Sequence, residues 1–538
     1  MVASQSSKVH SEPFTAGRLA KSTSDLLQEY VDTPKLKGEL QALPSVLQVD
    51  HAHLVMLAAQ GLITPNHAGA LIQELEDLGR SPDKFTAKAG YGTLNLQIEE
   101  YLAQRLGRDI AGRLPIGRSR IDHGATVRRL ADRNNVLEVQ KGLLALQDAL
   151  VKGAKKHGDT AIISFTHMQQ AQPATFGHYL LAFHDRFVDT FQLLSEVYDR
   201  FNRSPLGAVG LSGTDLPIDR KLTASLLGFP DILGNSLTGR DAYYQIEIAL
   251  ALSMVMTLLN DLCTDLHIQS STEFGYVELD DSHCSTSSIF PQKKNPVALE
   301  AIKLAAAESH GWVAAAQAIF RNEGTADQYY RHVPFMKTAC VSTANMLHLT
   351  AEIIQGLTVH KARCEDALAK AWVTTSRLGN VLMLQHGVDY RSAHGVVGRL
   401  VSICIARGIA PGQVTVELLQ EAAGEMGVGG IDLTQKDLTK ALDYKAFLND
   451  SNSLGGVGPL QFDRLLDAAI QQYGQNLDCV SDKERVLAEA RAKLNQAAEE
   501  LKNEASYPLE LGQQGKTERD HVHKEKPIVE VVESRVVV

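Results

Sequence analysis

"AYYQIEIALALSMVMTLLNDLCTDL", residues 242–266, is apolar nearly all round. A helix with apolar residues on every side is typical of the buried centre of a large protein. A membrane-spanning helix is the alternative, but five polar residues interrupt the stretch: Gln245, Glu247, Asn260, Asp261 and Asp265. The uninterrupted apolar part is too short to cross a bilayer. We therefore expect residues 242–266 to form the central helix of a bundle.

Segments on both sides continue the helical pattern. Five apolar residues recur at steps of three and four: Val136, Val139, Leu143, Leu146 and Leu150. Residues 176–201 have the same period, and residues 297–320 are rich in alanine, which permits close helix packing. Alternating strand patterns are scarce. The sequence predicts an all-α protein with long helices in its middle third.

The composition is that of a globular protein with several domains. The 538 residues are 44% apolar, 22% charged and 6% aromatic. A formal net charge of −10 argues against nucleic acid or an anionic membrane as the main partner. The six cysteines include no close pair, so we expect reduced thiols rather than disulfides. The first residues contain no apolar signal segment, and we expect a cytoplasmic location.

"TSSIFPQKKNP", residues 286–296, concentrates hydroxyls and lysines before the alanine-rich segment. We expect Asn295 to cap that helix, with Pro296 at its first position. The positive end of the helix, with Lys293 and Lys294 beside it, predicts a carboxylate or phosphate site. Ser287 has two possible chemical roles there, nucleophile or base. The alternative is an exposed loop with solvated lysines.

Two other polar clusters precede predicted helices. In "SFTHMQQAQP", residues 164–173, we expect Thr166 and His167 to lie before a helix that begins near Pro173. In "GRSRIDHGATVRR", residues 117–129, several charged side chains precede a long helix. A structural histidine and a solvated basic turn are the respective alternatives. The histidine pairs at 51/53 and 521/523 lack matching ligands, so no metal site is predicted.

Taken together and in this order, the three clusters resemble known signatures. "TSSIFPQKKNPVALEAIK" resembles G-S-S-x-M-P-x-K-x-N of the fumarase/aspartase superfamily, and "PQKKNP" looks most like its argininosuccinate lyase branch. "GRSRIDHGATVRR" is similar to that branch's G-R-S-R-N-D-Q-V-A-T, and "FTHMQQAQP" to its Y-T-H-L-Q-x-A-Q-P. The resemblance covers about residues 14–500.

This resemblance implies a three-domain, all-α fold around a central bundle of long helices. We expect these boundaries: a disordered tail at 1–15, an N-terminal helical domain at 16–115, the central bundle at 116–375, a C-terminal helical domain at 376–504 and a flexible tail at 505–538. The resemblance also implies a homotetramer with a core of about twenty helices, in which three subunits share each active site. The implied reaction is anti elimination across a C–N bond, releasing fumarate without a metal or organic cofactor.

The resemblance also assigns roles to individual residues. Ser287 matches the catalytic serine, which removes the Cβ proton of the substrate. Lys293 and Asn295 would hold the adjacent carboxylate, and His167, paired with Glu300, would deliver a proton or position the substrate. The implied substrate-binding residues are Thr166, Ser119, Arg120, Asn295, Ser288, Gln169 and His123.

Several positions depart from the pattern of the branch. The replacements, with the residue of the branch in brackets, are Thr286 (Gly), Phe290 (Met), Ile121 (Asn), His123 (Gln), Ala242 (Phe), Gln245 (Glu) and Asn95 (His). The segment that grips arginine in the branch reads "RNEGTADQYYRHVPF" here, residues 321–335, and Tyr329 and Arg331 are candidates for a new pocket. We therefore predict a lyase acting on an N-substituted aspartate whose amine is not arginine. The alternatives are an authentic argininosuccinate lyase and a non-catalytic structural oligomer on the same fold.

Overall fold

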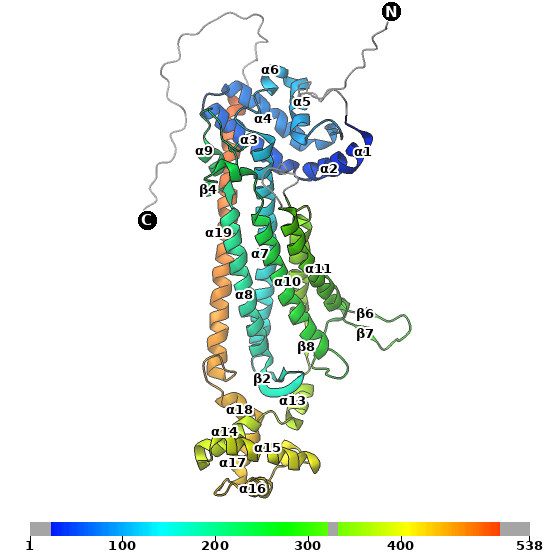
Figure 1. Ribbon diagram of the computed structural model, residues 1–538, viewed down its shortest axis with the longest axis vertical. Coiled ribbons are helices and arrows are strands. Elements are labelled where there is room, and N and C mark those ends of the chain that lie inside the picture. Colours follow the sequence, from blue (N-terminus) through cyan, green and yellow to red (C-terminus); the bar gives the residue numbers. More distant parts are fainter. Residues whose placement is uncertain (1–22, 321–331, 506–538) are drawn as a thin grey trace, which may run out of the picture.

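The computed structural model describes residues 23–320 and 332–505. Long helices run along the molecule, with shorter helices gathered at each end (Figure 1). The predicted tail at 1–15, nearly all of the tail at 505–538, and Tyr329 and Arg331 lie outside the described residues. The predicted all-α class is confirmed.

The N-terminal end is a cluster of short and medium helices around one apolar core. Its helices are α1 (Asp25–Leu27), α2 (Thr33–Gln41), α3 (Leu43–Ala59), α4 (Pro65–Arg80), α5 (Leu94–Leu106) and α6 (Arg108–Ala111). Leu54, Leu71 and Ile72 are fully buried in this core. The start of the long helix α7 and the end of the last helix, α19, both pack into this cluster.

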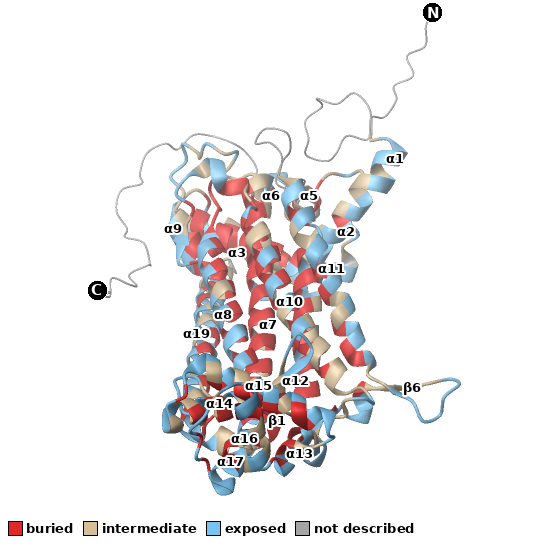
Figure 2. Cartoon of the chain, turned by 60° about the horizontal axis from the view of Figure 1, so that its bottom comes forward, coloured by how far each residue is buried: buried red, intermediate tan, exposed pale blue. Residues whose placement is uncertain are grey.

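The central bundle confirms the helices predicted from the apolar pattern. It consists of α7 (Arg120–Lys156), α8 (Phe176–Phe201), α10 (Tyr244–Gln269), α11 (Val297–Ile319) and α12 (Met336–Gly356). Among the described residues, α10 alone has the length and hydropathy of a membrane span, a test that core helices of soluble proteins also pass. It packs against α8, α11 and α12, and buried residues follow both α7 and α10 (Figure 2). Residues 242–266 thus contribute one of the core helices of the bundle.

A second small cluster with its own apolar core forms the C-terminal end. It contains α13 (Lys361–Lys370), α14 (Thr375–His386), α15 (Tyr390–Ala406), α16 (Val416–Glu425), α17 (Gln435–Leu442) and α18 (Tyr444–Asp450). Leu378, Leu400 and Leu438 are fully buried in it. The chain reaches this cluster after α12 and leaves it before α19.

The last helix, α19 (Pro459–Glu504), returns along the whole bundle to the N-terminal cluster (Figure 1). Its residue Phe462 joins the bundle core, and Leu494 joins the N-terminal core. At Gly69 of α4 the two helices approach so closely that an added Cβ would lie 2.2 Å from the Leu501 carbonyl oxygen. The expectation that residues up to 504 belong to the C-terminal domain is therefore wrong for α19; the other boundaries stay predictions.

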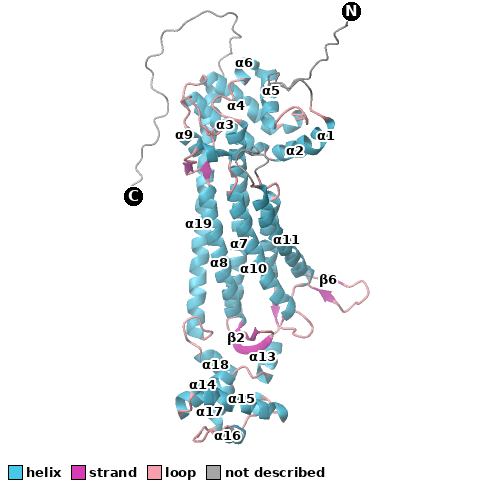
Figure 3. Cartoon of the chain, in the orientation of Figure 1, coloured by secondary structure: helices cyan, strands magenta, loops and turns pink. Residues whose placement is uncertain are grey.

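Short strand pairs connect the helices (Figure 3). The longest is an antiparallel hairpin of β1 (Ala161–Thr166) and β2 (Gln169–Thr175). The other pairs are β3 (Arg203–Ser204) with β4 (Asp231–Ile232), β5 (Val277–Glu278) with β8 (Thr358–Val359), and β6 (Ser285–Thr286) with β7 (Lys294–Asn295). A short helix, α9 (Arg220–Leu226), lies between β3 and β4 in the sequence.

The hairpin corrects the prediction of a helix from Pro173. Pro173 lies in β2 opposite Ile163, and the helix α8 begins only at Phe176. A two-stranded sheet leaves each strand with a free edge, so proline is tolerated there. The helix is capped by Thr175, whose side chain accepts a hydrogen bond from the backbone N–H of His178 at 3.1 Å. Thr166 and His167 are therefore held by a hairpin rather than by a helix start.

Candidate active site

Ser119 caps the N-terminal end of α7. Its Oγ accepts a hydrogen bond from Ile121 N at 3.2 Å, and Asp122 Oδ1 accepts one from Ser119 N at 2.8 Å. Asp122 Oδ2 also accepts hydrogen bonds from the backbone of Gly207 and Val209, at 2.8 and 2.9 Å. This reciprocal cap fixes the start of α7 and the loop after β3. Arg120 is exposed directly beside the cap.

A buried polar network between α3 and the start of α7 lies next to this cap. Asp50 of α3 forms an ion pair with Arg118 and accepts a hydrogen bond from His123 Nε2 at 2.9 Å. Burial alone would raise the pKa of Asp50, but the charges and hydrogen bonds of Arg118 and His123 outweigh burial and hold this pKa well below its usual range. The carboxylate is ionised and can only accept, so His123 Nε2 carries a proton.

The other ring nitrogen of His123 contacts Asn95 of α5. Asn95 Nδ2 lies 2.9 Å from His123 Nδ1, within hydrogen-bond distance. The branch pattern has histidine where Asn95 stands and glutamine where His123 stands. These two departures are therefore one exchange of an imidazole and an amide between contacting positions.

Glu99 of α5 lies near the same ion pair. Burial raises its pKa to about 7; the charge of Asp50 also raises it, whereas the charge of Arg118 lowers it. A carboxyl group with such a pKa takes up a proton near neutral pH, unlike the ionised Asp50 beside it. The network below the cap thus contains one carboxylate that titrates in the neutral range.

A cavity of about 550 Å³ lies beside the start of α7. It is lined by residues of α2, α5, α7 and α10 and by residues 332–337, among them Asn95, Arg120, His123, Gln245 and Lys337. Three of the positions that depart from the branch pattern therefore face one space. Arg120 and His123, both predicted to bind substrate, also face it. The cavity is the best candidate for a ligand-binding site around this end of α7.

Gln245 connects the two sides of this cavity. Its Nε2 donates to Asp132 Oδ2 at 2.7 Å, and its Oε1 accepts from Val333 N at 2.7 Å. Tyr244 donates a second hydrogen bond to the same Asp132 oxygen, at 2.8 Å. Because Gln245 uses both ends of its amide, a glutamate could not replace it without losing the donor to Asp132.

The second predicted cluster lies at the turn of the β1–β2 hairpin. His167 and Met168 occupy the turn with φ of 56° and 57°, between the paired Thr166 and Gln169. Two consecutive residues with positive φ are typical of a type I′ turn, which usually takes Asn or Gly. All four residues are exposed. The turn therefore presents the His167 ring to solvent at a cost in backbone energy, a pattern that clusters at functional sites.

The third cluster is the loop between β6 and β7, which projects from the side of the bundle (Figure 1). Ser287 Oγ accepts hydrogen bonds from Ile289 N at 3.2 Å and Phe290 N at 3.0 Å. Two N–H donors that point at one hydroxyl oxygen favour its anionic form. Ile289 and Phe290 themselves are exposed, and Ser288 and Lys293 lie on the same exposed loop.

The predicted cap of α11 is wrong by one residue. Asn295 pairs with Ser285 in the β6–β7 ladder, and Pro296 takes the cap position without a side-chain hydrogen bond. The helix begins at Val297, which places Glu300 in its first turn and exposes it. The ladder has only two residue pairs, so it left no alternating pattern in the sequence.

The two neighbouring lysines of this loop differ in their contacts. Lys294 Nζ lies 2.6 Å from Asp281 Oδ1 and 3.0 Å from Glu278 Oε1, and it donates to the Leu279 carbonyl at 2.7 Å. The hydrogen bond to Asp281 makes the largest contribution to raising the Lys294 pKa above its usual range. Lys293 has no side-chain hydrogen bond or ion pair within residues 23–320 and 332–505. Lys294 therefore anchors the loop, whereas Lys293 is exposed to solvent.

One chain does not bring the three clusters together. Ser119, Arg120 and His123 lie at the N-terminal end, the hairpin with Thr166, His167 and Gln169 lies at the opposite end of the bundle, and the Ser287 loop projects from its side (Figure 1). Within the described part of one chain, His167 and Glu300 form no hydrogen bond or ion pair. The predicted pairing stays a prediction.

The sequence reasoning missed Asp50 and Glu99. Asp50 lies among buried apolar residues of α3, where an isolated acid is the available signal, whereas Glu99 is followed by Glu100 on the amphipathic α5 and leaves no such signal. Their partner Arg118 is 68 residues from Asp50 in the chain, so only the fold reveals the pair.

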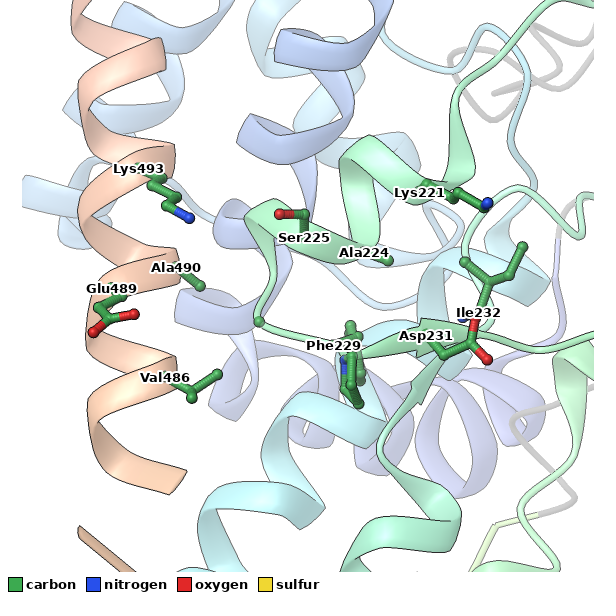
Figure 4. A pocket seen from close by; sticks show the side chains of 12 residues that line it. Lys221, Ala224, Ser225, Phe229, Asp231, Ile232, Val486, Glu489, Ala490 and Lys493 are labelled. Carbon is green, nitrogen blue, oxygen red and sulfur yellow. Dashed lines mark hydrogen bonds between the residues drawn. The ribbon is translucent and has the colours of Figure 1, made fainter. Parts of the chain in front are cut away.

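A further cavity, of about 440 Å³, lies between α9 and α19 (Figure 4). Lys221, Phe229 and Ile232 line one side, and Val486 and Lys493 the other. It contains no predicted site residue, so it is not the candidate active site. The described residues contain no group of three metal-ligating side chains, and the six cysteines are free thiols. Burial raises the pKa of the Cys284 thiol, which disfavours its reactive thiolate.

The sequence and the fold match those of known lyases. Residues 18–311 match the family model "Lyase", and residues 373–449 match "Argininosuccinate lyase C-terminal". The chain is 31% identical over 507 residues to an argininosuccinate lyase of Methanoculleus marisnigri, covering 92% of this chain and 99% of the relative. It is 32% identical over 475 residues to that of Methanospirillum hungatei, covering 86% and 94%.

A solved structure, an EDDS lyase variant with bound fumarate, superimposes with a TM-score of 0.80 at 26% identity, covering 90% of this chain and 97% of that chain. Together the fold and these matches define a carbon–nitrogen lyase. The chain belongs to the fumarase/aspartase superfamily, in its argininosuccinate lyase-like branch.

Proposed function

We propose that the protein eliminates fumarate from an N-substituted aspartate, or adds an amine to fumarate in reverse, and that the amine is not arginine. The observation that carries the proposal is the Ser287 loop, where two backbone N–H groups meet the Ser287 oxygen. A serine acts as a base only where its alkoxide is stabilised. These donors, with Lys293 on the same loop, supply that stabilisation.

The reaction follows from the proposed roles. Ser287 removes a Cβ proton, and Lys293 and Asn295 stabilise the negative charge that builds on the adjacent carboxylate. His167, held by Glu300, delivers a proton to the leaving nitrogen on the opposite face, completing an anti elimination. The proposed substrate-binding residues are Thr166, Ser119, Arg120, Ser288, Gln169 and His123. No step uses a metal or organic cofactor.

Because the clusters lie far apart in one chain, we propose a homotetramer in which three subunits share each site. Exposed apolar side chains on the bundle helices support this assembly. In soluble proteins, groups of exposed apolar side chains usually mark a surface that another subunit covers. They include Leu250 and Met254 on α10, Leu304 on α11 and Val341 on α12. Four copies of the bundle would form the core of about twenty helices. We also propose a cytoplasmic location, as for an enzyme of soluble metabolites.

The changed amine is supported by the cavity beside α7. Asn95, His123 and Gln245 depart from the branch pattern, and residues 321–335 replace the segment that grips arginine in the branch. A site that leaves polar groups of a substrate unpaired loses affinity steeply. Authentic argininosuccinate cleavage is the second candidate, favoured by the name of relatives that match nearly the whole chain.

Measuring the absorbance of fumarate tests both the role of Ser287 as the base and the identity of the amine. Argininosuccinate alone, and fumarate with a panel of amines, are incubated with the wild type and with Ser287→Ala. We expect amine addition without efficient argininosuccinate cleavage, and a loss of about 10²–10⁴-fold in kcat for Ser287→Ala. Ser481→Ala, at an exposed serine of α19, is the matched control. Efficient argininosuccinate cleavage would reject the changed amine, and an unaffected Ser287→Ala variant would reject the serine base.

A further inference from the structure

The cavity beside α7 has an excess of positive charge. Its charged lining consists of four cationic side chains and two carboxylates: Lys35, Arg120, Arg128 and Lys337, with Glu39 and Asp132. A concave space with this charge attracts anions and repels cations.

Both carboxylates already have donors from the protein. Glu39 Oε2 accepts a hydrogen bond from Leu94 N at 2.8 Å. Asp132 Oδ2 accepts from Tyr244 and Gln245, at 2.8 and 2.7 Å. A cationic ligand would have to compete with these donors for the two carboxylates, and competition of this kind weakens binding.

The replacement of the branch's glutamate by Gln245 also makes the cavity less favourable for a cationic ligand. The branch pattern places a carboxylate at this position, whereas here a neutral amide faces the cavity. The amide cannot be exchanged freely, because its Nε2 supplies one of the two donors to Asp132. One negative charge that would favour a cationic amine is therefore removed from the cavity by the same residue that holds Asp132.

Lys337 is the cation best placed to receive an anion. It is exposed in the first turn of α12 and lines the cavity. Its ammonium group forms no hydrogen bond or ion pair with any residue in the described ranges 23–320 and 332–505. The positive end of the 21-residue helix α12 adds to its field.

We propose that the amine component of the substrate carries a carboxylate or a similar anion away from its reacting nitrogen, and no cation there. The substrate class is thus an aminocarboxylate joined through its nitrogen to the succinyl group, with Lys337 binding the distal anion. This inference rests on the proposed elimination of fumarate, since it describes the leaving half of that substrate.

Three amines of nearly equal length separate charge from size. β-Alanine, propylamine and ethylenediamine place a carboxylate, a methyl group and a second amine at the same distance from the reacting nitrogen. Each is incubated with fumarate and enzyme, and the loss of fumarate absorbance is followed. We expect β-alanine to react with a kcat/KM about tenfold above the other two, as for one charge-assisted hydrogen bond. The preference should shrink as salt is added.

Two variants test whether Lys337 causes the preference for β-alanine. Lys337→Gln should lower kcat/KM for β-alanine about tenfold and leave that for propylamine unchanged. Lys436→Gln makes the same charge change at an exposed lysine of α17 and should alter neither. If propylamine or ethylenediamine reacts as well as β-alanine, or if Lys337→Gln leaves the preference intact, the aminocarboxylate assignment is overturned while fumarate chemistry stands. If no amine reacts and no fumarate is released from any N-substituted aspartate, the proposed function itself fails and this inference fails with it.

Discussion

Asn95 Nδ2 and His123 Nδ1 lie 2.9 Å apart, and the two residues have exchanged the side-chain types that the branch pattern places at their positions. The exchange keeps one imidazole and one amide in contact but moves the imidazole next to the buried Asp50. The two side chains contact each other and His123 also contacts Asp50, so a change at either position alters the surroundings of the other. The two substitutions therefore act as a unit.

Restoring the branch arrangement tests that coupling. We expect Asn95→His and His123→Gln each to lower the melting temperature and kcat/KM, because the first places two imidazoles in contact and the second replaces the imidazole that contacts Asp50. The double variant should recover a large part of both, with a coupling energy of about 1 kcal/mol or more. Thermal unfolding and kinetics of the four proteins in this cycle provide the measurement. Losses that simply add in the double variant would show the two sites to be independent.

Glu99 should make stability depend on pH in the neutral range. Its folded pKa of about 7 exceeds the ordinary value of 4.5, so between these values the folded protein holds a proton that the unfolded chain has released. Stability is therefore greatest below the lower value, falls as pH rises through this window and reaches its floor above the upper one. Glu99→Gln should raise the free energy of unfolding at pH 8 by up to about 3 kcal/mol, with no gain near pH 4.

Urea unfolding at several pH values measures this effect. Glu365→Gln, at an exposed glutamate of α13, is the control and should follow the wild type throughout. A Glu99→Gln variant whose advantage is the same at every pH would contradict a buried, titrating carboxyl group.

Replacing the two lysines of the Ser287 loop should have different effects on activity and on loop stability. Lys293→Met should lower kcat by about 10²-fold or more without changing the melting temperature, because it removes charge only from the transition state. Lys294→Met should release the loop from Glu278 and Asp281, increase proteolytic cleavage between β6 and β7, and lower kcat less. Limited proteolysis beside steady-state kinetics distinguishes them. The reverse pattern would assign the catalytic charge to Lys294.

Shared active sites predict complementation between inactive variants. His167→Ala and Ser287→Ala should each be inactive alone, yet tetramers re-formed from an equal mixture should regain about a quarter of the wild-type activity, since each contribution is intact in about half of the sites. Native mass spectrometry confirms mixing. Fully mixed tetramers without activity would place His167 and Ser287 of one chain in the same site.

The helices of the bundle could be predicted from sequence because burial imposes a local period. Residues 176–201 coincide with α8, and the apolar stretch 242–266 lies within or next to α10. The strand pairs could not be predicted in this way. Pro173 has the appearance of a helix start, whereas the hairpin depends on distant contacts, such as the shared cluster of Ile163 in β1 and Leu368 of α13.

The candidate site was predictable where function leaves dense local motifs and not where it depends on distant contacts. The Ser287 loop, the His167 turn and the Ser119 cap each occupy a short stretch. In contrast, Asp50 meets Arg118 and His123 across about seventy residues, and neither helix shows that contact in its own pattern. The different contacts of Lys293 and Lys294 also depend on acidic residues that folding brings close to Lys294.

The return of α19 to the N-terminal cluster has a consequence for the history of the chain. The bundle is interrupted after α12 and resumed at Pro459, and the C-terminal cluster occupies the excursion between them. Both ends of the excursion touch one hairpin, since α13 packs on β1 and α18 on β2. The match "Argininosuccinate lyase C-terminal" falls inside it, at residues 373–449. Topologically this cluster is an insertion between two helices of the bundle, so we expect it to tolerate replacement more readily than the bundle helices themselves.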